Sequence, residues 1–171
     1  MAAAAPVLAL PSGLYANASG EGALLPRELH FVHTHTSERL VVEYFREGQY
    51  LPDALSTVNH FLRDFRTEEV HTIQPALLDL LHRLAGVTEA TRPFQVISAY
   101  RSPKTNAMLR AHSEGVAAGS LHMVGQAIDI RIDAVPLPKL RAAALSLHSG
   151  GVGFYPASDF VHVDVGRVRT W

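Results

Sequence analysis

Large apolar side chains mark a hairpin and two helices in the part of the chain that follows residue 27. Two apolar runs within residues 28–45 flank a polar turn at residues 36–38, and this pattern predicts a β-hairpin. After Pro52 and again after Pro75, apolar positions recur every three to four residues, which predicts two amphipathic helices, the second stopping at Gly86. The recurring positions are Leu55, Val58, Phe61, Leu62 and Phe65, then Leu77, Leu80, Leu81 and Leu84. Both helices are interpreted as core scaffolding.

The second half of the chain alternates strand and helix patterns. Residues 94–100 form an apolar run typical of a buried strand. Ser102 suits a helix N-cap and Pro103 suits the first helical position, so a helix is expected from there to about His112. The remaining expected elements are a strand over residues 126–132, a helix over 137–148, short strands within 151–155 and 160–165, and an edge strand within 167–171. The pattern predicts an α+β fold with one domain over residues 28–171.

Composition removes several classes of function. The chain has 171 residues with 47% hydrophobic content, which is enough for one domain with one core. Its net charge of -1 comes from mixed acids and bases, so there is no broad positive field for nucleic acid, and we expect no such partner. It has no cysteine, which excludes disulfides and thiolate chemistry. No segment approaches the roughly 18 apolar residues of a membrane span. The sequence carries no signal for an oligomeric state.

The first 27 residues differ from the rest in composition. Residues 1–10 are small and apolar, the following stretch is rich in Gly, Ser, Ala and Asn, and no basic residue occurs before Arg27. A secretory signal wants a basic start and a longer apolar run. Residues 1–27 are therefore predicted to be either the remnant of a signal peptide or a flexible tail.

Two blocks, residues 120–129 and 159–164, contain histidines and carboxylates that suit a metal. In the strand over 126–132 the isoleucines face one way, so Asp129 faces the other, where it could pair with Arg131 on a solvated face. The loop before this strand carries His122 and could fold it back over Asp129. Two histidines and one carboxylate fill three of the four positions of a catalytic zinc and leave the fourth for water.

The second block places His162 and Asp164 on the same side of a strand, about 7 Å apart. A histidine in an apolar strand can also be a hydrogen-bonded core residue, and a His-x-Asp pair can be one in which the carboxylate fixes the ring tautomer. Residue spacing alone leaves these interpretations open. His33 and His35 share a strand face as well, but no matching acid lies beside them, so a structural or surface role is expected for them.

The wider motif is more specific. Ser-x-His-x-x-Gly-x-Ala-x-Asp over residues 120–129, followed by an acid three places before His162, resembles the zinc peptidases of the D-Ala-D-Ala metallopeptidase type, whose relatives include lysostaphin and the hedgehog signalling domain. Residues 98–102 resemble that group's strand-end arginine motif. The hairpin with its two histidines and the ending from Gly150 to Trp171 resemble the bacterial YcbK-like branch, and the resemblance covers residues 28–171.

This resemblance implies a fold and a set of site residues. The fold would be hedgehog/DD-peptidase-like, a central antiparallel sheet packed by helices with a Zn²⁺ site on the sheet. The metal ligands would be His122, Asp129 and His162. Arg101 would bind a substrate carboxylate or carbonyl, against the alternative of an exposed arginine at a strand end. Ser120 would bind substrate or shape its loop.

The general base is assigned from the same resemblance. The peptidases of this group carry an acid three residues before the last ligand, where Asp159 stands. Strict strand alternation would put Asp159 opposite His162, so only a bend would turn it to the metal. Asp164 is better placed by alternation, yet it could equally orient a ligand. Asp159 is assigned as the base, with Asp164 as a support of the site or the alternative base.

The predicted function is zinc-dependent hydrolysis of peptide bonds in bacterial peptidoglycan. The substrates would be stem peptides or cross-links, cut either by a cross-link endopeptidase or by a D,D-carboxypeptidase. The resemblance implies an exported protein, periplasmic or associated with the cell wall. The alternative is a non-catalytic, zinc-containing module that binds peptidoglycan, which would need the three ligands but no base.

Overall fold

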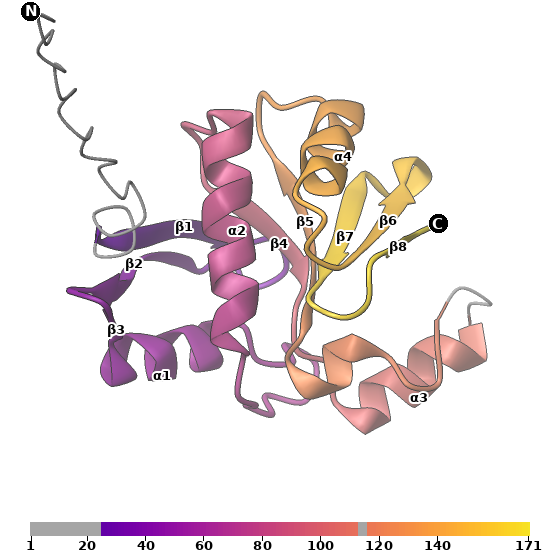
Figure 1. Cartoon of the computed structure of the whole chain (residues 1–171). Helices are drawn as coiled ribbons and strands as arrows, with labels where there is room; N and C mark the ends of the chain where they lie inside the picture. Colours follow the sequence, from indigo (N-terminus) through magenta and orange to yellow (C-terminus); the bar gives the residue numbers. More distant parts are fainter. Residues whose placement is uncertain (1–24, 113–115) are drawn as a thin grey trace, which may run out of the picture.

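An eight-stranded sheet runs through the described part of the chain (Figure 1). The computed structural model describes residues 25–112 and 116–171, so the tail predicted over residues 1–27 lies almost wholly outside the described residues. The strands are β1 Arg27–His33, β2 Arg39–Arg46, β3 Gln49–Tyr50, β4 Phe94–Ser98, β5 Ala127–Ile132, β6 Gly151–Tyr155, β7 Phe160–Asp164 and β8 Arg169–Thr170. The helices are α1 Pro52–Phe61, α2 Pro75–Thr88, α3 Pro103–His112 and α4 Leu137–Ser146, with short 3-10 turns η1 Leu121–Val124 and η2 Pro156–Ser158.

The sheet is mixed, in the order β3-β2-β1-β4-β5-β7-β6-β8. β1 and β4 pair in parallel, as do β6 and β8, while the other neighbours are antiparallel. A parallel pair needs a long connection, and the one between β1 and β4 runs through β2, β3, α1 and α2. The expectation of an α+β fold is confirmed, and the expectation of an antiparallel sheet is wrong at these two pairings.

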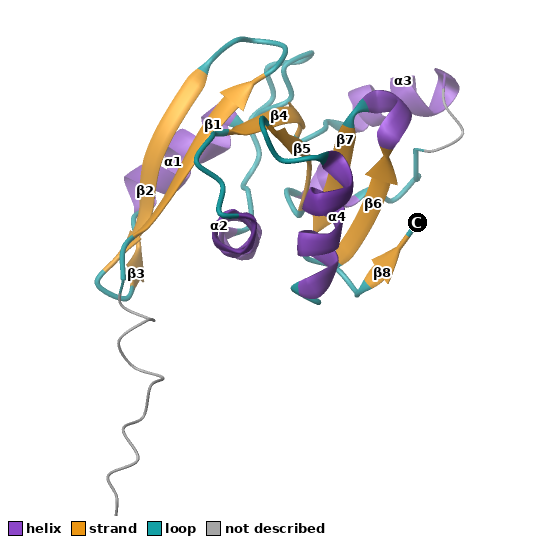
Figure 2. Cartoon of the chain, turned by 90° about the horizontal axis from the view of Figure 1, so that it is seen from above, coloured by secondary structure: helices purple, strands orange, loops and turns teal. Residues whose placement is uncertain are grey.

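Two helices cover one face of the sheet. α2 and α4 lie side by side there, as two views at right angles show (Figures 1 and 2). Ile128, Ile130 and Val161 of the central strands are fully buried in the same apolar cluster as Leu81 of α2 and Leu140 of α4. Because side chains alternate along a strand, the intervening residues of β5 and β7 face the opposite side of the sheet. That opposite side carries the polar residues of the two motif blocks.

Several predicted element ends shift by a few residues. α2 continues through Gly86 to Thr88, so the predicted stop at Gly86 is wrong; the helix ends where Glu89 adopts a left-handed conformation with φ of 52°. α4 ends at Ser146, earlier than predicted, and His148 follows with φ of 47°. The predicted N-cap of α3 is confirmed, because the Ser102 hydroxyl accepts a hydrogen bond from the Thr105 amide at 3.2 Å.

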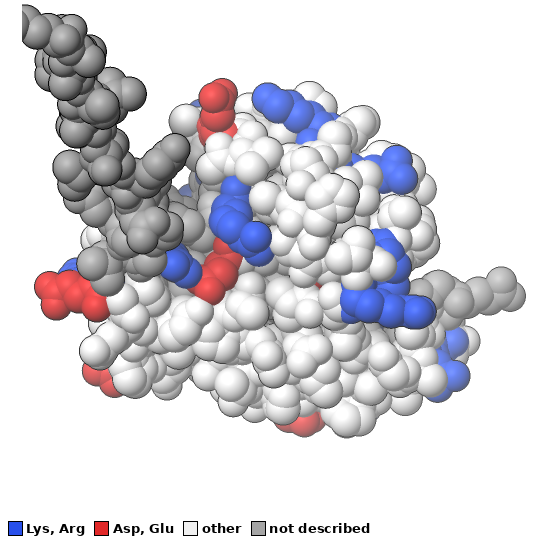
Figure 3. Space-filling model, in the orientation of Figure 1, with Lys and Arg blue, Asp and Glu red and all other residues white. Residues whose placement is uncertain are grey.

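Charge is local on the face of the molecule seen in Figure 3. Basic and acidic side chains there stand singly or in small groups among uncharged surface. Across the residues that the structure describes, every helix is too short or too polar to cross a bilayer.

Candidate metal centre and its cleft

The register of two central strands brings Asp129 and His162 together. β5 and β7 are antiparallel, and Asp129 lies directly opposite His162. Residues opposite each other in such a pair share a sheet face, and here His162 Nδ1 lies 2.9 Å from Asp129 Oδ1. The alternative pairing of Asp129 with Arg131 does not occur, because Arg131 bonds to Gln95 and Asp159 instead. The structure thus brings together two of the three residues that the resemblance implies as metal ligands.

The η1 turn carries His122 to the same place. Ser120 caps this turn, and its hydroxyl accepts from the His122 amide at 3.4 Å. Gly125 closes the turn with φ of 65°, against the Thr72 carbonyl, where any side chain would collide. His122 Nε2 lies 3.1 Å from His162 Nδ1 and 3.3 Å from Asp129 Oδ1. The predicted folding of His122 over Asp129 is therefore confirmed.

His122, Asp129 and His162 form the candidate metal cluster. Hydrogen bonds on the far side of each imidazole fix which nitrogen faces this cluster. His122 Nδ1 lies 2.7 Å from the Ala99 carbonyl oxygen, and His162 Nε2 lies 3.0 Å from Asp164 Oδ2. Both partners are acceptors, so each ring donates its proton outward, and the inward nitrogens present lone pairs. Together with Asp129 Oδ1, three acceptors converge on one point.

A divalent cation fits this arrangement of acceptors. Neighbouring ligands of a tetrahedral ion with bonds of about 2.0 Å are about 3.3 Å apart. The three contacts of 2.9, 3.1 and 3.3 Å approach that spacing. Within the described residues, His122, Asp129 and His162 form the one group of histidine and acidic side chains close enough to hold a metal.

Asp164 lies behind the His162 ring and is fully buried. Its Oδ1 accepts from the amides of Gly151 and Gly166, each at 2.9 Å, and its Oδ2 lies 2.7 Å from the Arg169 guanidinium as well as contacting His162. Burial alone would raise the pKa of Asp164, but His162, Arg169 and the two amides hold that pKa well below its usual range. Asp164 is thus an ionised acceptor that orients His162.

The cluster itself has strongly coupled charges. Burial would raise the pKa of Asp129, but the two histidines beside it hold that pKa well below its usual range. Burial opposes protonation of His162, yet the carboxylates of Asp129 and Asp164 outweigh it and raise the pKa of this imidazole. In the absence of a cation, the raised pKa of His162 favours a proton on its imidazole. A bound cation would displace this proton, because the two imidazole nitrogens and the Asp129 carboxylate would bind it in their unprotonated forms.

Arg101 is buried at the edge of the cluster and is not an exposed strand-end arginine. Its side chain is 10% exposed, and Nη2 lies 3.5 Å from both Asp129 Oδ2 and Ser98 Oγ. Its Nε is buried and makes no hydrogen bond within the described residues. Burial lowers the pKa of this guanidinium, which stays protonated nonetheless. The residue after it, Ser102, is fixed by Asp64 Oδ2 at 2.8 Å from its amide, a contact that sequence reasoning missed.

Asp159 lies outside the cluster. It follows the η2 turn with φ of 54°, and its side chain is 65% exposed and bonds to Arg131 at 2.9 Å. A cleft opens beside His122, Asp129 and His162. Ser158 and Phe160, the neighbours of Asp159, both line this cleft, whereas Asp159 does not. The chain bends here as the base assignment required, but the carboxylate is turned to Arg131. The role of Asp159 as base stays a prediction.

Comparison with known proteins assigns the chain to a family. Residues 21–171 match the sequence model of the family described as Peptidoglycan L,D-endopeptidase MepK. The chain belongs to this family. The YcbK-like resemblance predicted from the motifs is thereby confirmed.

Curated members of the MepK family cover most of the chain. The Peptidoglycan L,D-endopeptidase MepK of Escherichia coli K12 is 46% identical over 146 residues, which is 85% of this chain and 80% of that protein. The protein of the same name from Shigella flexneri gives the same values. The Probable peptidoglycan L,D-endopeptidase MepK of Haemophilus influenzae is 44% identical over 149 residues, which is 85% of this chain and 79% of that protein.

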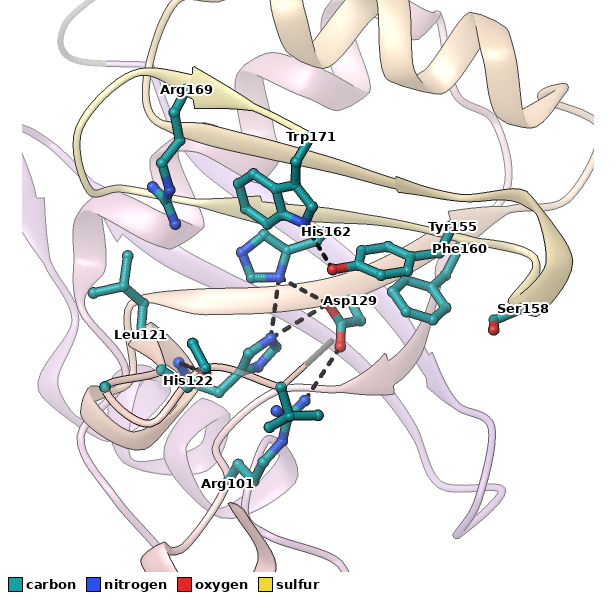
Figure 4. A pocket seen from close by; sticks show the side chains of 14 residues that line it. Arg101, Leu121, His122, Asp129, Tyr155, Ser158, Phe160, His162, Arg169 and Trp171 are labelled. Atoms are coloured by element: carbon teal, nitrogen blue, oxygen red, sulfur yellow. Dashed lines mark hydrogen bonds and ion pairs between the residues drawn. The ribbon is translucent and has the colours of Figure 1, made fainter. Parts of the chain in front are cut away.

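The candidate metal-binding residues of this MepK-family chain, His122, Asp129 and His162, lie in a cleft of about 430 Å³ (Figure 4). Arg101 and Ser120 line it, together with four residues that sequence reasoning missed: Tyr155, Phe160, Arg169 and Trp171. Gly153 lies opposite His162 in the sheet, and the Trp171 ring occupies the space above it. Gly153 is one of two glycines in β6, and the missing side chain there was the local signal that another side chain could pack over the strand.

The other histidine pair has a structural role, as expected. His33 Nδ1 accepts hydrogen bonds from the amides of His35 and Thr36 at 3.2 and 3.4 Å and so closes the β1–β2 turn. Burial lowers the pKa of His33 to about 4, so it is neutral near pH 7. The His35 ring stacks on Phe65 at 4.2 Å.

Proposed function

We propose that this chain is a zinc-dependent peptidoglycan hydrolase that cuts a peptide bond between an L- and a D-configured centre. The convergence of two imidazole nitrogens and one carboxylate oxygen at a cleft wall carries the proposal, because a catalytic zinc is commonly held by three such ligands with its fourth position open. Family membership supports the reaction and the substrate, since the relatives are named peptidoglycan L,D-endopeptidases. Of the two cutting modes predicted from the sequence, these names favour the endopeptidase.

The setting of the reaction follows from the same likeness. We place residues 28–171 in one zinc peptidase domain of the hedgehog/DD-peptidase-like kind, acting on cross-links or stem peptides of peptidoglycan. The protein would work outside the cytoplasmic membrane, in the periplasm or at the cell wall, where that polymer lies.

His122, Asp129 and His162 would hold the ion, and their nitrogen and oxygen donors suit zinc. When bound, zinc supplies Lewis-acid polarisation of the scissile carbonyl and a lowered pKa for water. The residues of the chain do the remaining work. Asp164 and the Ala99 carbonyl keep both imidazoles in the ligating tautomer through contacts of 3.0 and 2.7 Å.

Arg101 would hold the substrate. Its side chain lines the cleft, and its Nη2 makes only long contacts of 3.5 Å to Asp129 and Ser98, so this donor can turn to a substrate carboxylate or carbonyl. Its burial strengthens such a bond, because the surroundings screen charge less than water does. Ser120 would act mainly on the protein side, since its hydroxyl already caps the turn that presents His122.

Proton transfer falls to Asp159 in this proposal. Asp164 is fully buried with both oxygens engaged, which suits orientation of His162 and not exchange with water. Asp159 is exposed, and its neighbours on both sides reach the cleft, so a side-chain rotation away from Arg131 would bring its carboxylate toward a bound peptide. It would take a proton from the attacking water and deliver it to the leaving amine.

A cleavage assay on defined muropeptide dimers tests the function. The protein, loaded with zinc, is incubated with one dimer joined by an L,D bond and one joined by a D,D bond, and fragments are weighed by mass spectrometry. We expect monomers from the L,D dimer alone, loss of cleavage with a chelator, and recovery with zinc. Intact L,D dimers after incubation with the zinc-loaded protein would contradict the proposal.

One observation favours a second candidate, a module that binds peptidoglycan without cutting it. Among the described residues, Asp129 is the one carboxylate that lines the cleft, and it belongs to the metal cluster. A binder needs no base, so this arrangement would suffice for it. Co-sedimentation with peptidoglycan sacculi, run beside the dimer assay, decides the matter: a binding module is retained on sacculi and releases no fragment from either dimer.

A further inference from the structure

Tyr155 ends β6 at the wall of the cleft. Figure 4 shows its hydroxyl end directed toward His162 and Asp129, on the side of the cluster opposite Arg101. Sequence reasoning gave it no role, and the function proposed above does not use it. A phenol placed there can either fill space or contribute a hydrogen bond to a bound peptide.

The Trp171 indole fixes the direction of this hydroxyl. Trp171 Nε1 lies 2.7 Å from the Tyr155 oxygen. An indole N–H can only donate, so the phenol oxygen is the acceptor and keeps its own proton to give. Within the part of the chain that the structure describes, no hydrogen bond uses that proton. The phenol is therefore a donor whose direction is set before any substrate arrives.

Trp171 is itself held over the metal cluster. Its ring centroid lies 5.2 Å from that of His162, and its amide and carbonyl are paired with β6 through Val152 and Phe154 at 3.3 and 3.1 Å. The Arg169 guanidinium, already bonded to Asp164, lies 4.8 Å above the indole ring.

The remaining support comes from below and beside the two rings. Gly153 leaves the room that the indole needs, since a side chain there would collide with it. Tyr155 stacks on Phe160 with centroids 4.6 Å apart. A packed framework thus positions one hydroxyl proton, and a space-filling role alone would not need the hydrogen bond to the indole.

Such a donor matters when charge develops on the substrate. Attack on a peptide carbonyl puts negative charge on its oxygen, and a fixed donor stabilises that charge more than it stabilises the neutral carbonyl. We propose that Tyr155 is a catalytic residue that donates a hydrogen bond to this developing oxyanion, and that Trp171 is its positioning residue. The inference rests on the function proposed above and adds a substrate-contacting group to it. No proton is transferred by the phenol in this step.

The Tyr155→Phe variant removes the proton and keeps the ring. Loss of one oxyanion donor lowers kcat about 10²-fold, with KM for the L,D dimer, zinc content and melting temperature unchanged. Tyr50→Phe is the matched control, because Tyr50 also donates its hydroxyl proton, to Asp79, but on β3 away from the cleft; its kcat should equal that of the wild type. A Tyr155→Phe kcat within twofold of wild type would overturn the inference.

Trp171→Phe tests the positioning role. It removes the indole N–H and keeps an aromatic ring, so kcat should fall about tenfold with KM unchanged, and Tyr155→Phe/Trp171→Phe should be no slower than Tyr155→Phe alone. Losses that multiply in the double variant would refute the coupling. The wild-type result distinguishes failure of this inference from failure of the proposed function. If the wild type cleaves the L,D dimer and Tyr155→Phe has no effect, only the role of Tyr155 is refuted. If the wild type does not cleave it, the proposed function is refuted as well.

Discussion

Replacement of Asp164 by asparagine should weaken the metal site without touching a ligand. The carboxylate accepts from His162 through Oδ2 and from the amides of Gly151 and Gly166 through Oδ1, while Arg169 contacts both oxygens. In the variant the amide oxygen satisfies the two backbone amides best, so the new NH₂ group faces His162 Nε2. Donor then meets donor unless the imidazole moves its proton to Nδ1. That nitrogen is the one that would bind the metal, so the change blocks the ligating tautomer.

The expected loss can be sized from these contacts. Disturbing the acceptor behind a ligating histidine typically costs 10- to 100-fold in metal affinity, or about 1.4 to 2.8 kcal/mol. The fold should weaken too, because Arg169 loses its charge-assisted hydrogen bond to the fully buried Asp164; its own side chain is 31% exposed and can turn to water, so about 1.5 kcal/mol of the free energy of unfolding is at stake. Saturating zinc should restore part of the activity.

Zinc affinity is measured by competition with a chromophoric chelator, and stability by urea unfolding of the metal-free protein. Asp133→Asn is the control, because Asp133 is exposed and accepts from Gln95 at 2.6 Å away from the metal cluster. Its zinc affinity should match that of the wild type. An Asp164→Asn protein that binds zinc within twofold of wild type would refute the tautomer argument.

Three other predictions concern single side chains. The pKa of His33 is about 4 in the folded protein and near 6.5 in the unfolded chain. The free energy of unfolding should therefore be unaffected by His33 above pH 6.5 and fall by about 3 kcal/mol from there toward pH 4. In urea unfolding, His33→Asn should lack this pH dependence, and an equal pH dependence in both proteins would contradict the prediction. Arg101→Lys, which lacks the planar fork, should lower kcat/KM for the L,D dimer about 10- to 100-fold, and unchanged kinetics would argue against substrate contact. Asp159→Asn should lower kcat about 10²-fold or more with zinc retained, whereas Arg131→Ala, which frees the carboxylate, should not; full turnover by Asp159→Asn would remove it as the base.

Most elements could be predicted from local patterns, whereas the three candidate metal ligands were assigned through the resemblance of the wider motif. The alternation of Ile128 and Ile130 with Asp129 sets which side of β5 is polar, and one short motif holds His122 and Asp129 seven residues apart. The turn that joins them depends on Gly125, whose left-handed conformation and close approach to the Thr72 carbonyl only glycine allows. Local pattern therefore covered the polar face of β5 and the spacing of His122 and Asp129, whereas the choice of the three ligands depended on the resemblance.

What sequence reasoning missed depends on contacts between distant residues. Asp64 reaches the amide of Ser102 across 38 positions, and Trp171 arrives over His162 only because β8 returns beside β6 in parallel. The direction of Asp159 could not be predicted either. Strand alternation does not hold at a residue with φ of 54°, and its partner Arg131 lies on another strand. Tertiary pairing, not local pattern, sets these positions.

Anomalous diffraction at the zinc edge, on crystals grown with one equivalent of zinc, tests the central claim most directly. The account predicts a single strong peak within bonding distance of His122 Nε2, Asp129 Oδ1 and His162 Nδ1, and no such peak in crystals of His162→Ala. A principal peak at any other histidines, such as His33 and His35, or no peak in the wild type, would contradict it.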